Sequence, residues 1–383
     1  MIRVSVNEDI LRWALDRSQK RIDDLRNKFP KIGQWFTGEV DPTLRQLESL
    51  ARVTMTPLGY FFLEKPPKEE LPIPHFRSIS DVAPSTPSPD LLDTIHLMQQ
   101  RQAWMREYLL EEGQEALSFV RSASLTKQPT VIAHHIRNIL GFHERWASSM
   151  RTWEEALRTL REAMENVGIL VVVNGIVGNN THRTLDPDEF RGFVLVDDYA
   201  PLVFVNNADS KAAQMFTLAH ELAHVFFGSS AAFDLREMQP ANEPTELSCN
   251  RVAAEFLVPE SELRQIWPFV KNDPEPFQTI ARQFKVSVLV AARRALDLAL
   301  INREAFFQFY DDYLSDEHRK AVRQESGGDF YANQNFRVGR LFASTVVRAT
   351  QEGKLLYSEA FQLTGLYGKT FDHYVNSLRT GNA

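Results

Sequence analysis

The chain has 383 residues, 43% of them hydrophobic, and carries 43 Lys and Arg against 50 Asp and Glu, a net charge of −7. This is a globular composition with room for two or three domains, and it excludes a global positive field for nucleic acid. No apolar run reaches the roughly 18 residues of a membrane span, and the first residues lack the order of a secretory signal. Because the single cysteine, Cys249, has no intramolecular partner, we expect a cytoplasmic protein without membrane contact.

The first 65 residues predict a small helical module. Short amphipathic segments alternate with tight turns, and Asp41 followed by Pro42 is typical of an N-cap and the first position of a helix. Prolines then recur through residues 66–90, and because proline prevents regular backbone hydrogen bonding, this stretch predicts a connector. We therefore place the first domain at 1–65.

The rest of the chain predicts an α+β fold that is mainly helical. Helical patterns fill 91–167, three short β-branched runs predict a small sheet, and helices follow to the end. The runs are GILVVVNG, FRGFVLVD and PLVFVNN. The last run, near 201–207, directly precedes a helix and is either a sheet edge on which an extended peptide lies or an inner strand. We assign 91–305 to one domain and 306–383 to a helical C-terminal region.

Two histidines and a carboxylate interrupt an apolar helical pattern in TLAHELAHVFFG, residues 217–228. His220 and His224 are four residues apart, so both imidazoles share one helix face and can bind one metal ion. Glu221 lies about 100° further around the helix and can reach a water held by that metal. The alternative is a pair of core histidines with hydrogen-bond partners. A buried helix with three polar groups favours zinc, which compensates all three.

An open zinc site needs a third protein ligand, and five downstream residues are candidates. They are Glu237, Glu243, Glu246, Cys249 and Glu255. Glu246 shares a helical stripe with Ala253 and Leu257, so it is the carboxylate that faces the core. The opposite face, with Glu255, is predicted to be solvated, and Cys249 is interpreted as a small buried hydrophobe.

The expected ligand set indicates a hydrolytic rather than a structural zinc site. Structural sites have four protein ligands, commonly cysteines, whereas two histidines and one glutamate leave a position for water. Zinc lowers the pKa of that water toward 7, and Glu221 can take its proton to attack a peptide carbonyl. Asn250 follows Glu246 by one turn and either orients a ligand through a hydrogen bond or lies on the helix surface.

Three segments of the sequence resemble the ImmA/IrrE family of metallo-endopeptidases, in the arrangement with an Xre-type helix-turn-helix ahead of the protease. The segments are HELAH at 220–224, ELSCNRVAAEFLVP at 246–259 and EFRGFVLVDDYAPLVFVNN at 189–207. The resemblance implies a zincin-like protease core of the HExxH type within 91–305. It also implies that His220, His224 and Glu246 bind Zn²⁺ and that Glu221 is catalytic.

The same resemblance implies a regulatory setting. Family members cleave or control a DNA-binding repressor in stress-response or mobile-element contexts. The tail EGKLLYSEAFQLTGLYGKTFDHYV is similar to tails of relatives encoded beside PIN-domain toxins. The leading interpretation is therefore a zinc endopeptidase acting on a specific protein. The alternative is an antitoxin-like binding protein, or a promoter-binding regulator, that keeps the zinc site without proteolysis.

Direct DNA binding by the first module has weak support in the sequence. The second helix, the turn and the recognition helix of an Xre-type domain would have to fit into RIDDLRNKFPKIGQWFTGE, which leaves little room for the turn. Residues 1–60 hold ten basic and eight acidic side chains, so their net charge is only +2. Local phosphate contacts could come from Arg21, Arg26, Lys28 and Lys31, and we expect weak, salt-dependent affinity. The alternative is a module that binds protein.

Overall fold

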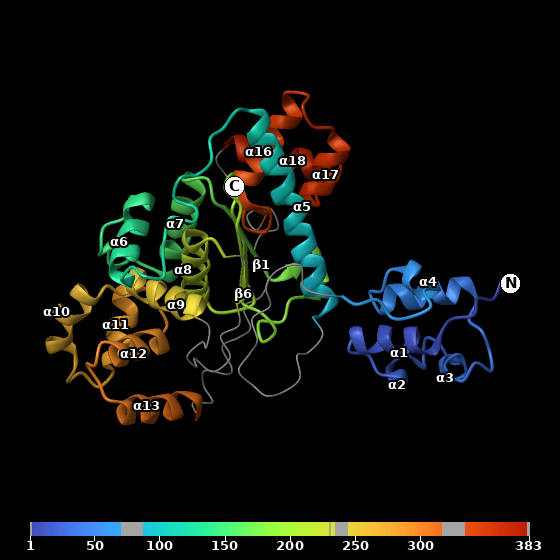
Figure 1. Ribbon diagram of the computed structural model, residues 1–383, viewed down its shortest axis with the longest axis horizontal. Helices are drawn as coiled ribbons and strands as arrows, with labels where there is room; N and C mark the ends of the chain where they lie inside the picture. The colour runs from blue at the N-terminus through green and yellow to red at the C-terminus, as the bar shows by residue number, and fades with distance from the viewer. Residues whose placement is uncertain (1, 70–86, 230, 234–243, 316–333, 381–383) are drawn as a thin grey trace. The chain divides into compact units, whose positions relative to one another are not determined.

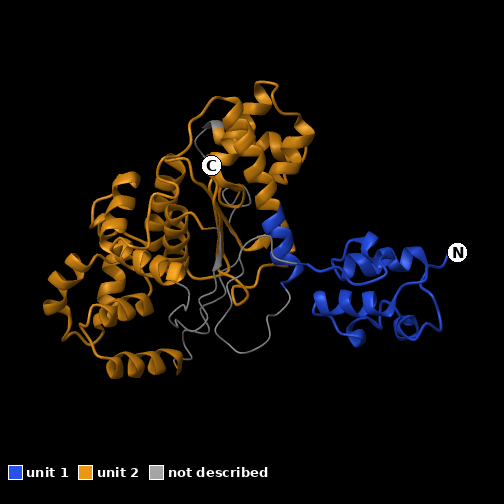
Figure 2. Cartoon of the chain, viewed as in Figure 1, with its two compact units in different colours: residues 1–72, 80–96 blue, residues 73–79, 97–383 orange. Residues whose placement is uncertain are grey.

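The computed structural model describes residues 2–69, 87–229, 231–233, 244–315 and 334–380 (Figure 1). The chain divides into two compact units, residues 1–72 with 80–96 and residues 73–79 with 97–383 (Figure 2). Most of the predicted connector at 66–90 lies outside the described residues. Within the described part of the chain, no helix is both long and apolar enough to cross a membrane.

The first unit contains a helical module with its own core. Its elements are α1 (Glu8–Arg17), α2 (Ile22–Leu25), α3 (Ile32–Phe36), α4 (Leu44–Val53) and the 3-10 helix η1 (Leu58–Phe62). Fully buried side chains on α1, α3 and α4 join in one hydrophobic cluster. The predicted cap of α4 is wrong, because Thr43 rather than Asp41 is the N-cap. Its hydroxyl accepts from the Gln46 N–H while the Gln46 side chain accepts from the Thr43 N–H.

A four-stranded sheet forms the centre of the second unit. Its strands, in spatial order, are β1 (Leu170–Asn174), β5 (Leu202–Asn206), β4 (Gly192–Leu195) and β6 (Ala231–Phe233). β1 and β5 are parallel, whereas β4 runs antiparallel to both of its neighbours. β2 (Ile176–Val177) and β3 (Asn180–Thr184) form a separate antiparallel pair. The interpretation of 201–207 as a sheet edge is therefore wrong, because β5 lies between β1 and β4.

The two faces of the sheet pack against different groups. The helices α7 (Trp153–Asn166) and α8 (Lys211–Phe227) cover one face, where strand valines such as Val203 join their hydrophobic cluster (Figure 1). On the other face the rings of Phe193 and Phe204 stack with centroids 4.9 Å apart. Since successive strand residues point to opposite faces, burial of both faces explains the nearly continuous apolar runs in the sequence.

C-terminal elements cover the outer edge of β1. These elements are η5 (Asn335–Gly339), α16 (Arg340–Gln351), α17 (Tyr357–Thr364) and α18 (Lys369–Thr380), and the long helix beside them is α5 (Pro89–Glu111). Gly339 has a φ of +86°, and a Cβ added there would lie 2.9 Å from the carbonyl oxygen of Val171 on β1. The buried Arg101 guanidinium donates to the carbonyl oxygens of Arg337 and Leu363, which ties α5 to these elements.

The remaining helices complete the second unit. They are α6 (Pro129–Leu140), η2 (Trp146–Ser149), α9 (Pro244–Leu257), α10 (Glu260–Val270), α11 (Pro276–Phe284), α12 (Val288–Asp297) and α13 (Arg303–Ser315). α9 lies between α8 and α6 and contacts both. The fold is thus α+β and mainly helical, as predicted, and α8 and α9 are its central helix pair.

Candidate metal centre

The helix that carries the HELAH sequence is fixed at both ends. The Ser210 side chain caps its first turn by accepting from the Ala213 N–H, and Gly228 ends it in the left-handed conformation with a φ of +80°. The backbone N–H groups of Arg121 and Ala123 donate to the carbonyl oxygens of Val225 and Phe226. The last turn of α8 is therefore held by a neighbouring segment, and the histidines just before it have a rigid support.

His220, His224 and Glu246 converge between α8 and α9. The two Nε2 atoms are 3.0 Å apart, and the Glu246 carboxylate oxygens lie 3.2 Å from His220 Nε2 and 2.6 Å from His224 Nε2. One possible ligand atom from each residue lies within 4.8 Å of the ligand atoms of the other two residues, and all three residues are buried. The structure thus brings together the three side chains that the sequence favoured.

The donor set fits a small metal ion. Tetrahedral zinc with bonds of about 2.05 Å places its ligand atoms about 3.3 Å from one another, close to the separations of 3.0 and 3.2 Å and longer than the 2.6 Å between His224 Nε2 and Glu246. Burial alone would raise the pKa of the Glu246 carboxyl, but hydrogen bonds from His220 and His224 outweigh it and lower that pKa to about 2. Burial lowers the pKa of His220, which favours the neutral imidazole that metals bind. An ionised carboxylate beside a neutral imidazole is the state that zinc needs.

Two further side chains lie next to the histidines. Asn250 on α9 is close enough to His220 to raise the pKa of its imidazole, but the Asn250 Oδ1 atom has no hydrogen-bond partner among the described residues, so the orienting role stays a prediction. The Ser229 hydroxyl lies 2.9 Å from His224 Nδ1, which leaves Nε2 for the ligand position. Sequence reasoning missed Ser229 because it follows the helix and belongs to no helical stripe. Its position just after the C-terminal Gly228 is the signal that could have identified it.

Glu221 lies beside the three converging side chains and is not one of them. It is completely buried, and neither carboxylate oxygen has a hydrogen-bond partner among the described residues. Its Oε1 approaches β4, where it would be 3.5 Å from a Cβ added to Gly192. Burial, followed by the nearby charge of Glu246, raises the pKa of the Glu221 carboxyl well above its ordinary value. A buried carboxylate needs a hydrogen-bond donor, and a water held at the metal would supply one.

The other candidate ligands have different environments. Glu237 and Glu243 lie outside the described residues. Cys249 is buried, as predicted, and burial raises the pKa of its thiol well above the ordinary value. The prediction of a solvated Glu255 is wrong. That side of α9 packs on other helices, so Glu255 is buried and forms an ion pair with Arg294 of α12.

The Glu255–Arg294 pair has a measurable consequence for stability. We expect Glu255→Gln to lower the free energy of unfolding by about 3–5 kcal/mol, because it leaves the buried Arg294 charge uncompensated. The matched control is Glu260→Gln, which breaks an exposed pair with Arg264 and should cost no more than about 1 kcal/mol. Urea denaturation of both variants measures the two losses in the free energy of unfolding. Equal losses would show that the buried pair stabilises the fold no more than the exposed pair does.

Comparison with known proteins agrees with this geometry. Residues 164–296 match the family model described as the IrrE N-terminal-like domain, a metallopeptidase family model, and they include all six residues of the centre discussed above. Residues 338–377 match a domain of unknown function, DUF8813. This match begins at the end of η5 and extends into α18. No curated protein matches the chain. The segment that holds His220, His224 and Glu246 is therefore similar to the IrrE N-terminal-like domain of the ImmA/IrrE metallopeptidases.

Proposed function

We propose that the protein is a zinc-dependent endopeptidase that hydrolyses a peptide bond in a specific protein. One observation carries this proposal: three ligand-type side chains converge next to a buried glutamate that has no partner of its own. A structural zinc site would need no such carboxylate. The family match at 164–296 supports the metallopeptidase class.

Each residue of the centre has a distinct task in this proposal. His220, His224 and Glu246 would hold the ion, Ser229 orients the His224 ring, and Asn250 lies beside His220. The ion would supply Lewis acidity, which activates water and polarises the scissile carbonyl. Glu221 accepts the proton of the attacking water and returns it to the departing amide nitrogen. Burial raises the pKa of the Glu221 carboxyl, which makes the carboxylate a stronger base toward that water.

The sheet limits which peptides can reach the centre. The strand nearest Glu221 is β4, and β6 of the same chain already pairs with it. β6 is the outermost strand on this side of the sheet, so an extended substrate would pair with β6 or replace it. The complete burial of Glu221 favours a narrow substrate range, such as one repressor or regulatory partner in a stress, mobile-element or toxin–antitoxin setting.

DNA contact is not part of the proposed function. Two of the basic side chains that the sequence offered for phosphate contacts form ion pairs within their own helical module. Arg21 lies 3.6 Å from Asp24, and Arg26 lies 3.1 Å from Asp23. These exposed pairs lower the local positive charge but leave Lys28 and Lys31, so phosphate contacts by the module would be weak and salt-dependent.

An alternative is a binding protein in which the zinc site serves stability, with a toxin as the kind of partner. The observation that favours it is the complete burial of Glu221 together with the pairing of β6 on β4. A metal in such a protein would contribute to folding without admitting a substrate.

The experiment that tests proteolysis compares new protein N-termini in a cell lysate treated with zinc-loaded or zinc-free protein. We expect cleavage of one or few proteins at one or few sites, and slow cleavage of unfolded casein, because Glu221 and the three metal-ligand side chains are buried. Rapid, unselective casein digestion would contradict the narrow substrate range. The absence of any new N-terminus would favour the binding protein.

A further inference from the structure

A groove lies on the outer side of the metal-binding helix pair, away from the metal centre. It consists of two hollows of about 280 Å³ and 240 Å³, and both have Lys127 and Ile132 in their walls. The walls come from the segment 122–129, one side of α6 from Val131 to Asn138, and residues of α8 and α9. We call this feature the α6–α9 groove.

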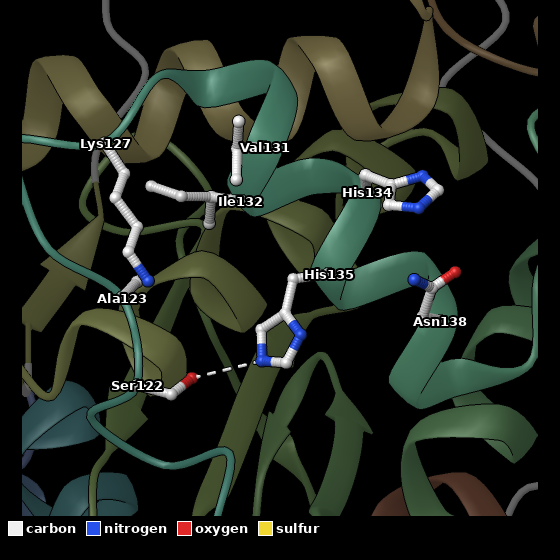
Figure 3. A pocket seen from close by; sticks show the side chains of 8 residues that line it. All are labelled: Ser122, Ala123, Lys127, Val131, Ile132, His134, His135 and Asn138. Carbon is white, nitrogen blue, oxygen red and sulfur yellow. Dashed lines mark hydrogen bonds between the residues drawn. The ribbon is translucent and has the colours of Figure 1, made fainter.

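The groove presents apolar side chains to solvent. Leu125 is 50% exposed and Val131 is 55% exposed, and both line the groove. Phe227 of α8 and Val252 of α9 extend the apolar wall toward the second hollow. Figure 3 shows Val131 and Ile132 above the first hollow, with the Lys127 side chain running along one side toward Ala123. Such a wall suits one or two aliphatic side chains of a bound peptide.

The charge of the groove is opposite to that of the whole protein. None of the residues that line either hollow is Asp or Glu, although the chain carries 50 of them. Lys127 and Arg251 line the second hollow, and neither has an ion-pair partner among the residues that the structure describes. By contrast, Arg121 pairs with Asp198 nearby. Two uncompensated cations beside exposed apolar groups are complementary to an acidic, partly apolar segment.

The groove has a rigid base that is shared with the metal centre. The Ala123 N–H donates to Phe226 O at 2.9 Å, and the His135 ring packs edge-on against the Phe226 ring. Arg251 directly follows Asn250, which contacts His220 from the inner side of α9. A peptide in the groove would therefore lie on the outer surface of the helices whose inner surfaces carry the metal ligands.

We propose that the α6–α9 groove docks an acidic peptide segment of the partner protein. Carboxylates of the segment pair with Lys127 and Arg251, and an aliphatic side chain between them packs on Leu125, Val131 and Ile132. The identity of the partner as a substrate rests on the proposed function, but the docking itself requires no metal.

The test measures binding of a fluorescein-labelled peptide, Glu-Glu-Leu-Glu-Glu-Leu-Glu-Glu, to the full-length protein by fluorescence anisotropy. We expect the same peptide with Gln in place of Glu to bind at least about tenfold more weakly, and added salt to weaken binding of the acidic form. The double variant Lys127→Glu/Arg251→Glu should lose binding to a similar degree. The control Lys271→Glu changes an exposed lysine at the end of α10, outside the groove, and should bind as the wild type does.

Equal affinity of the wild type and the double variant for the acidic peptide would overturn the proposal. So would a single-stranded oligonucleotide that competes better than the acidic peptide, since the groove would then be a nucleic-acid site. Once a protein that the enzyme cleaves is known, the double variant should cleave that protein with a higher KM and an unchanged kcat. Peptide binding without any proteolysis would reject the proposed function and keep the docking groove.

Discussion

Glu221→Gln is expected to keep the fold and the bound zinc and to reduce cleavage by about 10²–10⁴-fold. Glutamine has nearly the same shape as glutamate, and the side chain at 221 is not one of the three that converge on the ion. A glutamine side chain cannot accept the proton of the attacking water at neutral pH. The variant therefore removes the general base and changes little else in the site. Zinc content and cleavage rate, measured on the same sample, separate the two properties.

The control for this variant is another buried glutamate outside the centre. Glu262 is buried and forms an ion pair with Arg145, so Glu262→Gln changes a buried carboxylate without touching the metal centre. We expect this control to cleave at nearly the wild-type rate. If Glu221→Gln retained full activity with full zinc content, Glu221 would not be the base. If its effect in cells matched the wild type without any cleavage, the binding protein would be the better description.

Removal of a metal ligand is expected to have the second large effect. His220→Ala, His224→Ala and Glu246→Ala should each lower the zinc content from about one ion per chain to near zero at micromolar protein, since each removes one of three protein bonds. Each change also leaves the other two buried polar groups without their partner, so the thermal midpoint should fall. Elemental analysis after dialysis gives the zinc content directly.

The control for the ligand variants is Cys249→Ala. Cys249 lies on the same helix as Glu246 and is buried, but it is not part of the converging group. We expect this variant to keep its zinc. Loss of zinc from Cys249→Ala, together with full zinc in His220→Ala, would reverse the assignment of the site.

The convergence of the three side chains could be predicted because it depends on local helical geometry. The spacing of His220 and His224 places them on one face of any helix, and Glu246 lies on the apolar stripe of its own helix. Two apolar helices that each carry polar groups on a buried face must bring those groups together to satisfy them. The structure shows this arrangement, with all three side chains buried.

Features that depend on long-range packing could not be predicted in the same way. The position of β5 between β1 and β4 depends on the pairing of strands that are distant in the chain, and three apolar runs do not determine their order. Glu255 was expected to be solvated because its helix face looks polar in isolation. Arg294, which pairs with it, comes from a helix 39 residues further along the chain. Ser229 was missed for a related reason, since its contact with His224 forms only when the chain turns after Gly228.

The most direct test of the central claim is anomalous X-ray scattering at the zinc absorption edge from crystals of the zinc-loaded protein. The proposed site predicts one strong peak, bonded at about 2.0–2.2 Å to Nε2 of His220, Nε2 of His224 and a carboxylate oxygen of Glu246. Glu221 should lie beyond bonding distance, within hydrogen-bond reach of a water on the ion. A peak bonded to Cys249 or to Glu221, or a protein that crystallises from excess zinc with no peak between α8 and α9, would contradict the claim.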